Sequence, residues 1–90
     1  MDLSGKHRKI LEQLLRKPTP RNINWYDVEV LLLACGAKLI EGAGSRVKFR
    51  IQAHSLVTHR QHPQKEAKPY QIRDAIEFLR AMGLLEAENL

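Results

Sequence analysis

The chain has 90 residues, 43% of them hydrophobic and 28% charged, which is typical of one small globular domain and excludes a disordered chain. No apolar run approaches the ~20 residues of a membrane-spanning helix, and no apolar signal core follows Met1, so we expect neither a membrane protein nor a secreted one. The formal net charge is +5, and this excess of basic residues favours a polyanionic partner.

The first predicted helix extends from Ser4 to about Lys17. The Ser4 side chain can accept a hydrogen bond from an N–H of the first turn, and Pro18 and Pro20 end the helix because proline has no N–H to donate. A narrow apolar stripe predicts the buried face, which consists of Ile10, Leu11, Leu14 and Leu15.

The second predicted helix begins after Asn24, whose side chain can cap it, and ends before Gly36, which can adopt the left-handed conformation of a helix end. Its apolar residues form two faces, Trp25, Val28, Leu31, Leu32 and Cys35 on one and Tyr26, Val30 and Leu33 on the other. Because both faces must be covered, we expect the second to bind either the N-terminal helix or a partner protein.

Three strands follow, predicted at residues 37–41, 45–51 and 55–60, with turns at 42–44 and 52–54. The middle strand alternates strictly, so Val47, Phe49 and Ile51 face one side while the other side receives Arg46, Lys48 and Arg50. The sequence therefore predicts an antiparallel sheet with one apolar and one basic face.

The last predicted helix begins near Pro69 and stops at Gly83, and its buried stripe contains Ile72, Ala75, Ile76, Leu79 and Met82. Arg73 and Glu77 can pair on its exposed side. Helices gathered on one face of an antiparallel sheet give an α+β fold. We divide the chain into an N-terminal helix with a Pro-rich connection (1–20), an RNA-binding domain (21–85) and a tail (86–90).

The basic residues are concentrated in one part of the chain. Between Gly42 and Arg73 there are seven basic residues and one acid, Glu66, so this segment carries +6 and the rest −1. Successive outward cations on a strand lie ~6–7 Å apart, a spacing close to that of neighbouring phosphates. We predict RNA binding by Arg46, Lys48, Arg50, Arg60, Lys65, Lys68 and Arg73. The alternative is a solvated edge strand that charge protects from aggregation.

Histidines accompany these cations, because His59 and His62 flank Arg60 and His54 lies at the start of the same strand. Metal-free ribonuclease chemistry needs a base for the ribose 2′-OH, and histidine, with an ordinary pKa near neutrality, is suited to that role. The simpler interpretation is that His59 and His62 are polar residues on the surface without a catalytic role. A zinc site of Cys35, His54, His59 and His62 is a weaker alternative, because the helix that carries Cys35 offers no second ligand. No metal or cofactor is therefore expected, and a single cysteine, which cannot form an internal disulfide, indicates the cytoplasm.

Several short motifs, in order, resemble the HicA toxins of bacterial toxin–antitoxin pairs. They span Trp25 to Leu84 and include Trp25-Tyr26-Asp27-Val28-Glu29, Gly44-Ser45-Arg46-Val47-Lys48-Phe49, Thr58-His59-Arg60-Gln61-His62-Pro63 and the Lys68-Pro69 helix start. The resemblance implies a double-stranded-RNA-binding-domain-like αβββα fold, here with an additional N-terminal helix. It also implies an endoribonuclease that cleaves messenger RNA without a metal, inhibits translation and is neutralised by a HicB-like antitoxin.

The chain departs from the family at Arg46, which stands where the family's catalytic histidine follows Gly-Ser. Arginine can bind phosphate but cannot act as a base at neutral pH. We therefore predict that His62, which matches a recurrent family histidine, or else His59, performs proton transfer. Otherwise the domain binds RNA without cutting it, or serves as an adaptor through the face formed by Tyr26, Val30 and Leu33. An acidic antitoxin is expected to mask Arg46, Lys48, Arg50 and Arg60, with apolar contacts to Tyr26 or Leu33.

Overall fold

The fold of residues 3–85 is described by a computed structural model. Its elements in chain order are α1 (Gly5–Leu14), α2 (Trp25–Ala34), β1 (Lys38–Glu41), β2 (Arg46–Ile51), β3 (His54–His59) and α3 (Pro69–Ala81). The α+β class and the αβββα order behind an additional helix are thus confirmed. The tail expected at 86–90 lies outside the described residues. Within residues 3–85 no helix is long and apolar enough to cross a membrane.

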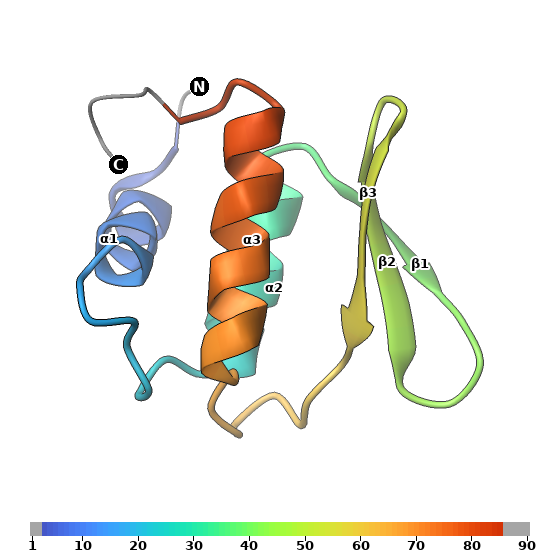
Figure 1. The fold of residues 1–90 in the computed structure, drawn as a ribbon, viewed down its shortest axis with the longest axis horizontal. Coiled ribbons are helices and arrows are strands. Elements are labelled where there is room, and N and C mark those ends of the chain that lie inside the picture. Colours follow the sequence, from blue (N-terminus) through green and yellow to red (C-terminus); the bar gives the residue numbers. More distant parts are fainter. Residues whose placement is uncertain (1–2, 86–90) are drawn as a thin grey trace.

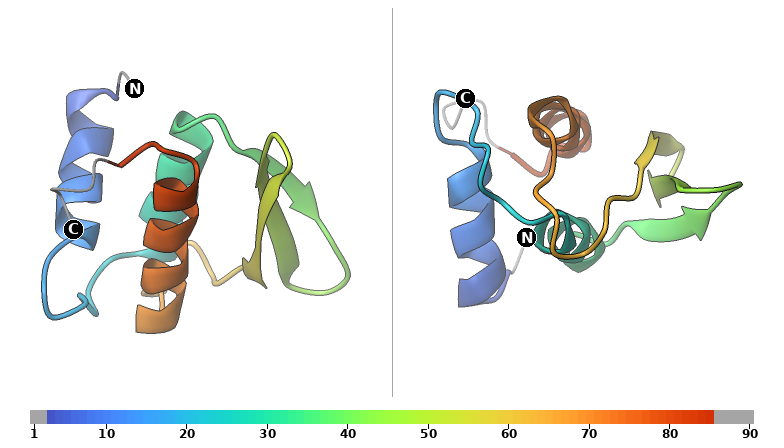
Figure 2. Two further views of the ribbon diagram at one scale, coloured as in Figure 1. Left: turned by 45° about the horizontal axis from the view of Figure 1, so that its top comes forward. Right: turned by 90° about the horizontal axis from the view of Figure 1, so that it is seen from below.

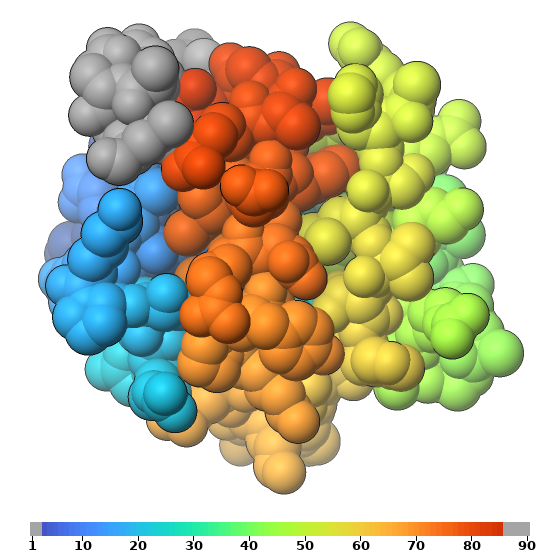
Figure 3. Space-filling view, viewed as in Figure 1, coloured from blue at the N-terminus to red at the C-terminus, as the bar shows by residue number. Residues whose placement is uncertain are grey.

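The elements form three layers, which Figures 1 and 2 show from different sides. The first layer is α1, the second is the pair α2 and α3, and the third is the sheet. The strands are antiparallel in the order β1-β2-β3. In the space-filling view α3 lies across the front of the molecule, between α1 and β3 (Figure 3). Because α1, α2 and α3 all lie on one side of the sheet, its other face is left open by the described part of the chain.

The middle strand fixes which residues occupy that open face. Along β2 the side chains alternate as predicted, with Val47 and Phe49 buried and Arg46, Lys48 and Arg50 exposed. Directly opposed residues of neighbouring strands point to the same face of a sheet. The open face therefore holds three cross-strand rows, which are Lys38-Arg50-Ser55, Ile40-Lys48-Val57 and Arg46-His59.

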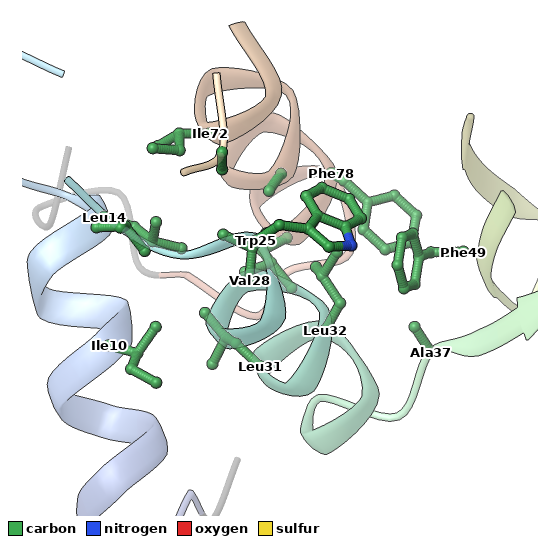
Figure 4. Close-up of a cluster of buried hydrophobic side chains, with 14 of the residues drawn as sticks. Ile10, Leu14, Trp25, Val28, Leu31, Leu32, Ala37, Phe49, Ile72 and Phe78 are labelled. Atoms are coloured by element: carbon green, nitrogen blue, oxygen red, sulfur yellow. The ribbon is translucent and has the colours of Figure 1, made fainter. Parts of the chain in front are cut away.

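The core joins all three layers (Figure 4). Between α2 and the sheet, the rings of Trp25 and Phe49 lie with centroids 6.3 Å apart at a tilt of 56°. From the other side, Ile10 and Leu14 of α1 enter the same buried cluster as Leu31 of α2. The N-terminal helix therefore shares one hydrophobic core with the rest of the fold.

Two local predictions were wrong. Asn24 is the N-cap of α2, yet its side chain makes no capping hydrogen bond. Instead the N–H groups of Trp25 and Tyr26 donate to Lys65 O at 2.8 Å and Pro63 O at 3.2 Å, because the loop before α3 passes the start of α2. On α3, Glu77 pairs with Arg80 at 3.5 Å rather than with Arg73.

Candidate nucleic-acid interface

The open face of the sheet carries a row of cations along its central strand. Arg46, Lys48 and Arg50 are all exposed, and neither an ion pair nor a side-chain hydrogen bond to any of them occurs within residues 3–85. Lys38 of β1 stands opposite Arg50 and adds a fourth exposed cation. Cations that are not neutralised by carboxylates remain available to bind phosphates and to release the counterions of a nucleic acid. We call Arg46, Lys48 and Arg50 the basic row.

Exposed apolar side chains flank the basic row at its centre. Ile40 of β1 and Val57 of β3 are both paired with Lys48, one on each side, and are 38% and 53% exposed. Together with Arg46 and Val47 they line a shallow depression. Phosphates and the apolar faces of bases can therefore both find partners on this surface.

One of the two candidate histidines lies on this surface. His59 is paired with Arg46 across the β2–β3 ladder and is exposed. Its Nδ1 is 3.2 Å from Ser45 Oγ. From the helix side, the buried Gln71 donates from Nε2 to His59 O at 2.8 Å and to Thr58 Oγ1 at 3.0 Å. The backbone of His59 is thus held at the end of β3 while its imidazole lies beside Arg46.

His62 occupies a different setting, in the loop after β3. Its Nδ1 accepts from the N–H of Gln64 at 3.2 Å, and its carbonyl accepts from the N–H of Lys65 at 2.9 Å, which closes a turn. Carbonyls of that turn cap α2, so the loop is tied to the helix layer. No hydrogen bond within the described part of the chain joins His62 to the basic row.

Arg60, which we grouped with the RNA-binding cations, is held by carboxylates. Its Nε and Nη2 donate to Glu29 Oε1 and Oε2 at 3.0 and 2.9 Å, and its Nη1 lies 3.6 Å from Glu41. Hydrogen bonding to Glu29 raises the pKa of the Arg60 guanidinium above its ordinary value. Glu29 also accepts from Trp25 Nε1 at 3.0 Å. Arg60 thus joins α2, β1 and the end of β3, and its charge is largely compensated.

The remaining predicted cations are not brought onto the open face. Lys65 and Lys68 line a depression with Asn24 near the start of α2. Arg73 lines a groove between α3 and the residues that follow α1, together with Arg16 and Arg80. The seven cations that are close in the sequence therefore divide among four settings: the basic row, the ion pairs of Arg60, the depression near the start of α2 and the groove along α3.

The face proposed for a partner is only partly covered. Tyr26 and Leu33 are 52% and 40% exposed, and Val30 is partly buried. The N-terminal helix packs elsewhere on α2, with Ile10 and Leu14 in the cluster that contains Val28. Of the two alternatives for this face, the N-terminal helix therefore does not cover Tyr26 and Leu33, because the shared core orients α1 towards the other face of α2.

The zinc alternative finds no support in the geometry. Among residues 3–85 no three His, Cys, Asp or Glu side chains lie close enough together to hold a metal ion. Cys35 is partly buried at the end of α2, and this burial raises the pKa of its thiol. A thiol that stays protonated is a poor ligand and a poor nucleophile.

Three residues that support this surface were missed in the sequence. Ser45 lacks the sequence setting of a serine nucleophile, yet it contacts His59. Gln71 follows Pro69 on the buried side of α3, where a polar residue is unusual and predicts a hydrogen-bonded contact. Glu29 is an acid within an apolar helix. Trp25 lies one turn before it, and this spacing could have predicted the hydrogen bond that joins the two side chains.

Gln71 offers a first test of how the sheet is held. Its side chain is 2% exposed and makes hydrogen bonds to β3 and to the N–H of Lys68. Replacing Gln71 with alanine leaves these buried groups unpaired, so we expect a loss of about 1–3 kcal/mol in the free energy of unfolding. Urea denaturation measures the loss. The exposed Gln64, changed to alanine, is the control, and equal stability of the two variants would contradict the role of Gln71.

Comparison with protein families identifies one match. The model described as "HicA toxin of bacterial toxin-antitoxin" matches residues 25–84, which include α2, the whole sheet and α3. Comparisons with curated proteins and with solved structures gave no significant match. The additional helix α1 lies outside the matched residues.

Proposed function

We propose that this chain, which belongs to the HicA family of toxins from bacterial toxin–antitoxin pairs, binds messenger RNA on the open face of its sheet, cleaves it and so inhibits translation in the cytoplasm. The basic row carries the proposal, since three exposed cations, none of them paired with a carboxylate within residues 3–85, follow one strand. A surface of this kind suits the phosphates of an extended RNA strand. The apolar residues Ile40 and Val57 beside it can contact bases.

Cleavage is proposed to proceed without a metal. The ribose 2′-OH loses its proton and attacks the neighbouring phosphorus, and cations stabilise the charge that grows on the phosphate oxygens. Arg46 can hold those oxygens but cannot take the proton. The proton then passes to a histidine, for which the chain offers His62 and His59 as candidates.

The antitoxin is the proposed protein partner. An acidic protein of the HicB type would inhibit the toxin by covering the basic row, with further apolar contacts to Tyr26 and Leu33, which are exposed on α2. Val30 between them is partly buried and would contribute less. Arg60 is already paired with Glu29 and Glu41, so it is a weaker contact than the sequence indicated.

Expression of the chain alone in a bacterial host tests the toxin function. We expect growth to stop and messenger RNA to be degraded, and we expect the purified chain to cleave single-stranded RNA in the presence of EDTA. Normal growth at high levels of folded protein would contradict the proposal. RNA binding without cleavage would favour a non-catalytic RNA-binding module, the alternative that Arg46 in the place of a histidine supports.

The partner surface gives a separate prediction. The chain, purified from its native source, is expected to carry an acidic protein that is released by high salt, because screening weakens contacts between opposite charges. Replacing Tyr26 and Leu33 together with serine should weaken this association and leave RNA binding unchanged. Recovery of only the free chain at every expression level would argue against such a partner.

A further inference from the structure

We propose that proton transfer in this chain is performed by His59, which is oriented by Ser45 and placed beside Arg46 by the register of β2 and β3. This inference rests on the proposed RNA cleavage and names the residues that carry it out. It assigns the reaction to two residues on neighbouring strands. Arg46 of β2 supplies a cation for the phosphate, and His59 of β3 supplies the base.

The register brings His59 and Arg46 together. Arg46 pairs with His59, and the N–H of Arg60 donates to Ser45 O at 2.6 Å. Arg46 and His59 are therefore a non-hydrogen-bonded pair of the antiparallel ladder, the type in which opposing side chains approach most closely, with Cβ atoms about 4.5–5.5 Å apart. An oxygen of one phosphate group can thus contact Arg46 while the adjacent ribose contacts the imidazole.

Ser45 gives the imidazole a defined orientation. With Nδ1 3.2 Å from Ser45 Oγ, the other ring nitrogen, Nε2, is left for substrate. A serine hydroxyl can accept from Nδ1–H, and it can continue to do so after Nε2 has taken a proton. Ser45 is therefore a positioning residue, and its contact with Nδ1 leaves Nε2 to act as the base when Nδ1 carries the proton.

The backbone below the imidazole is also fixed. Gln71 donates to His59 O at 2.8 Å, and the neighbouring Thr58 is 7% exposed and bonded to the same amide. This buried anchor restrains the end of β3 from the helix side, while the His59 side chain remains accessible on the open face. His59 is thus a restrained base beside Arg46, a cation that can hold the phosphate. This arrangement suits the transfer of the ribose 2′-OH proton to the imidazole.

The step balances within the RNA. Nε2 of His59 takes the 2′-OH proton, the 2′ oxygen forms a bond to phosphorus, and the bond between phosphorus and the 5′ oxygen breaks. The leaving 5′ oxygen takes a proton from solvent, and the imidazolium returns its proton to solvent. Arg46 and Lys48 hold the non-bridging oxygens. The products are a 2′,3′-cyclic phosphate and a free 5′-OH.

The other histidines lack this setting. His7 also contacts a serine, with its Nδ1 3.0 Å from Ser4 Oγ, but it lies on α1, in the layer farthest from the sheet. His54 opens β3, opposite Ile51, and is separated from His59 by the length of the strand, about 17 Å at the usual rise per residue. His62 Nδ1 accepts from the N–H of Gln64 inside its own turn. Among the described histidines, only His59 is paired with a residue of the basic row.

Cleavage of a mixed-sequence single-stranded RNA by the full chain in EDTA tests the proposal. We expect His59→Ala to lower the cleavage rate on the order of 10²–10⁴-fold with RNA affinity retained. His54→Ala is the matched control and should cleave at the wild-type rate. Because His59 is exposed, added imidazole can enter the space left in His59→Ala, and we expect it to restore part of the rate; a purely structural role would not give this rescue.

Ser45 is tested by a pair of variants. Ser45→Ala should lower kcat on the order of 3–10-fold with KM little changed, and Ser45→Thr, which keeps the hydroxyl, should restore the rate. If the wild type cleaves and His59→Ala cleaves within a few-fold of it, or if imidazole does not restore the lost rate, the assignment to His59 is overturned while RNA cleavage stands. A wild type that binds RNA without cleaving it overturns the cleavage itself.

Discussion

Replacing Phe49 with alanine is expected to lower the free energy of unfolding by about 3–5 kcal/mol. Phe49 is fully buried and its ring lies against Trp25, so the variant loses the contact that attaches the sheet to α2 and leaves a cavity. Small domains are stable by about 5–15 kcal/mol, so much of the stability is removed. Urea denaturation, followed by fluorescence of the single tryptophan, measures the loss.

Val57→Ala provides the matched control for this prediction. Val57 belongs to the same sheet but is 53% exposed on the open face, so its truncation should change the free energy of unfolding by about 0.5 kcal/mol or less. A Phe49→Ala variant as stable as Val57→Ala would show that the sheet is not held by the aromatic contact.

Replacing Arg46, Lys48 and Arg50 together with glutamine is expected to weaken RNA binding most at low salt. The ratio of wild-type to variant affinity should be about 100-fold larger at 0.1 M salt than at 1 M salt. Each phosphate contact to single-stranded RNA contributes about 0.7 to the slope of log affinity against log salt, so three lost contacts lower the slope by about 2. Fluorescence anisotropy with a labelled RNA across a salt series measures both values. The fold should persist, since all three side chains are exposed.

The N-terminal helix supplies a control of equal charge change. Lys6, Arg8 and Lys9 are exposed on α1, the layer farthest from the sheet (Figure 2). Their replacement with glutamine lowers the net charge by the same amount, yet it should affect the affinity and the slope much less. Equal effects of the two triple variants would indicate that RNA responds to net charge alone and would remove the basic row as a binding site.

The sequence by itself determined the order and type of the elements and the character of the open face, although α1 ends at Leu14 rather than near Lys17 and His54 belongs to β3 rather than to a turn. Strict alternation along residues 46–51 places cations on one side and apolar residues on the other in any sheet, because side chains alternate along a strand. The period of the last helix and the positions of Pro69 and Gly83 similarly predicted α3, which spans Pro69–Ala81. These features depend on neighbours within a few residues, so local patterns were sufficient.

Only the tertiary structure decided which charged and titratable groups meet. Arg60 is paired with Glu29, 31 positions away, and Arg73 faces a groove on α3, although both lie in the same basic segment as Arg46. The place of His59 beside Arg46 depends on the register of β2 and β3, since a shift by one residue would turn it to the other face. Contacts between distant segments follow from how the layers pack around the core, which residue type and spacing alone do not specify.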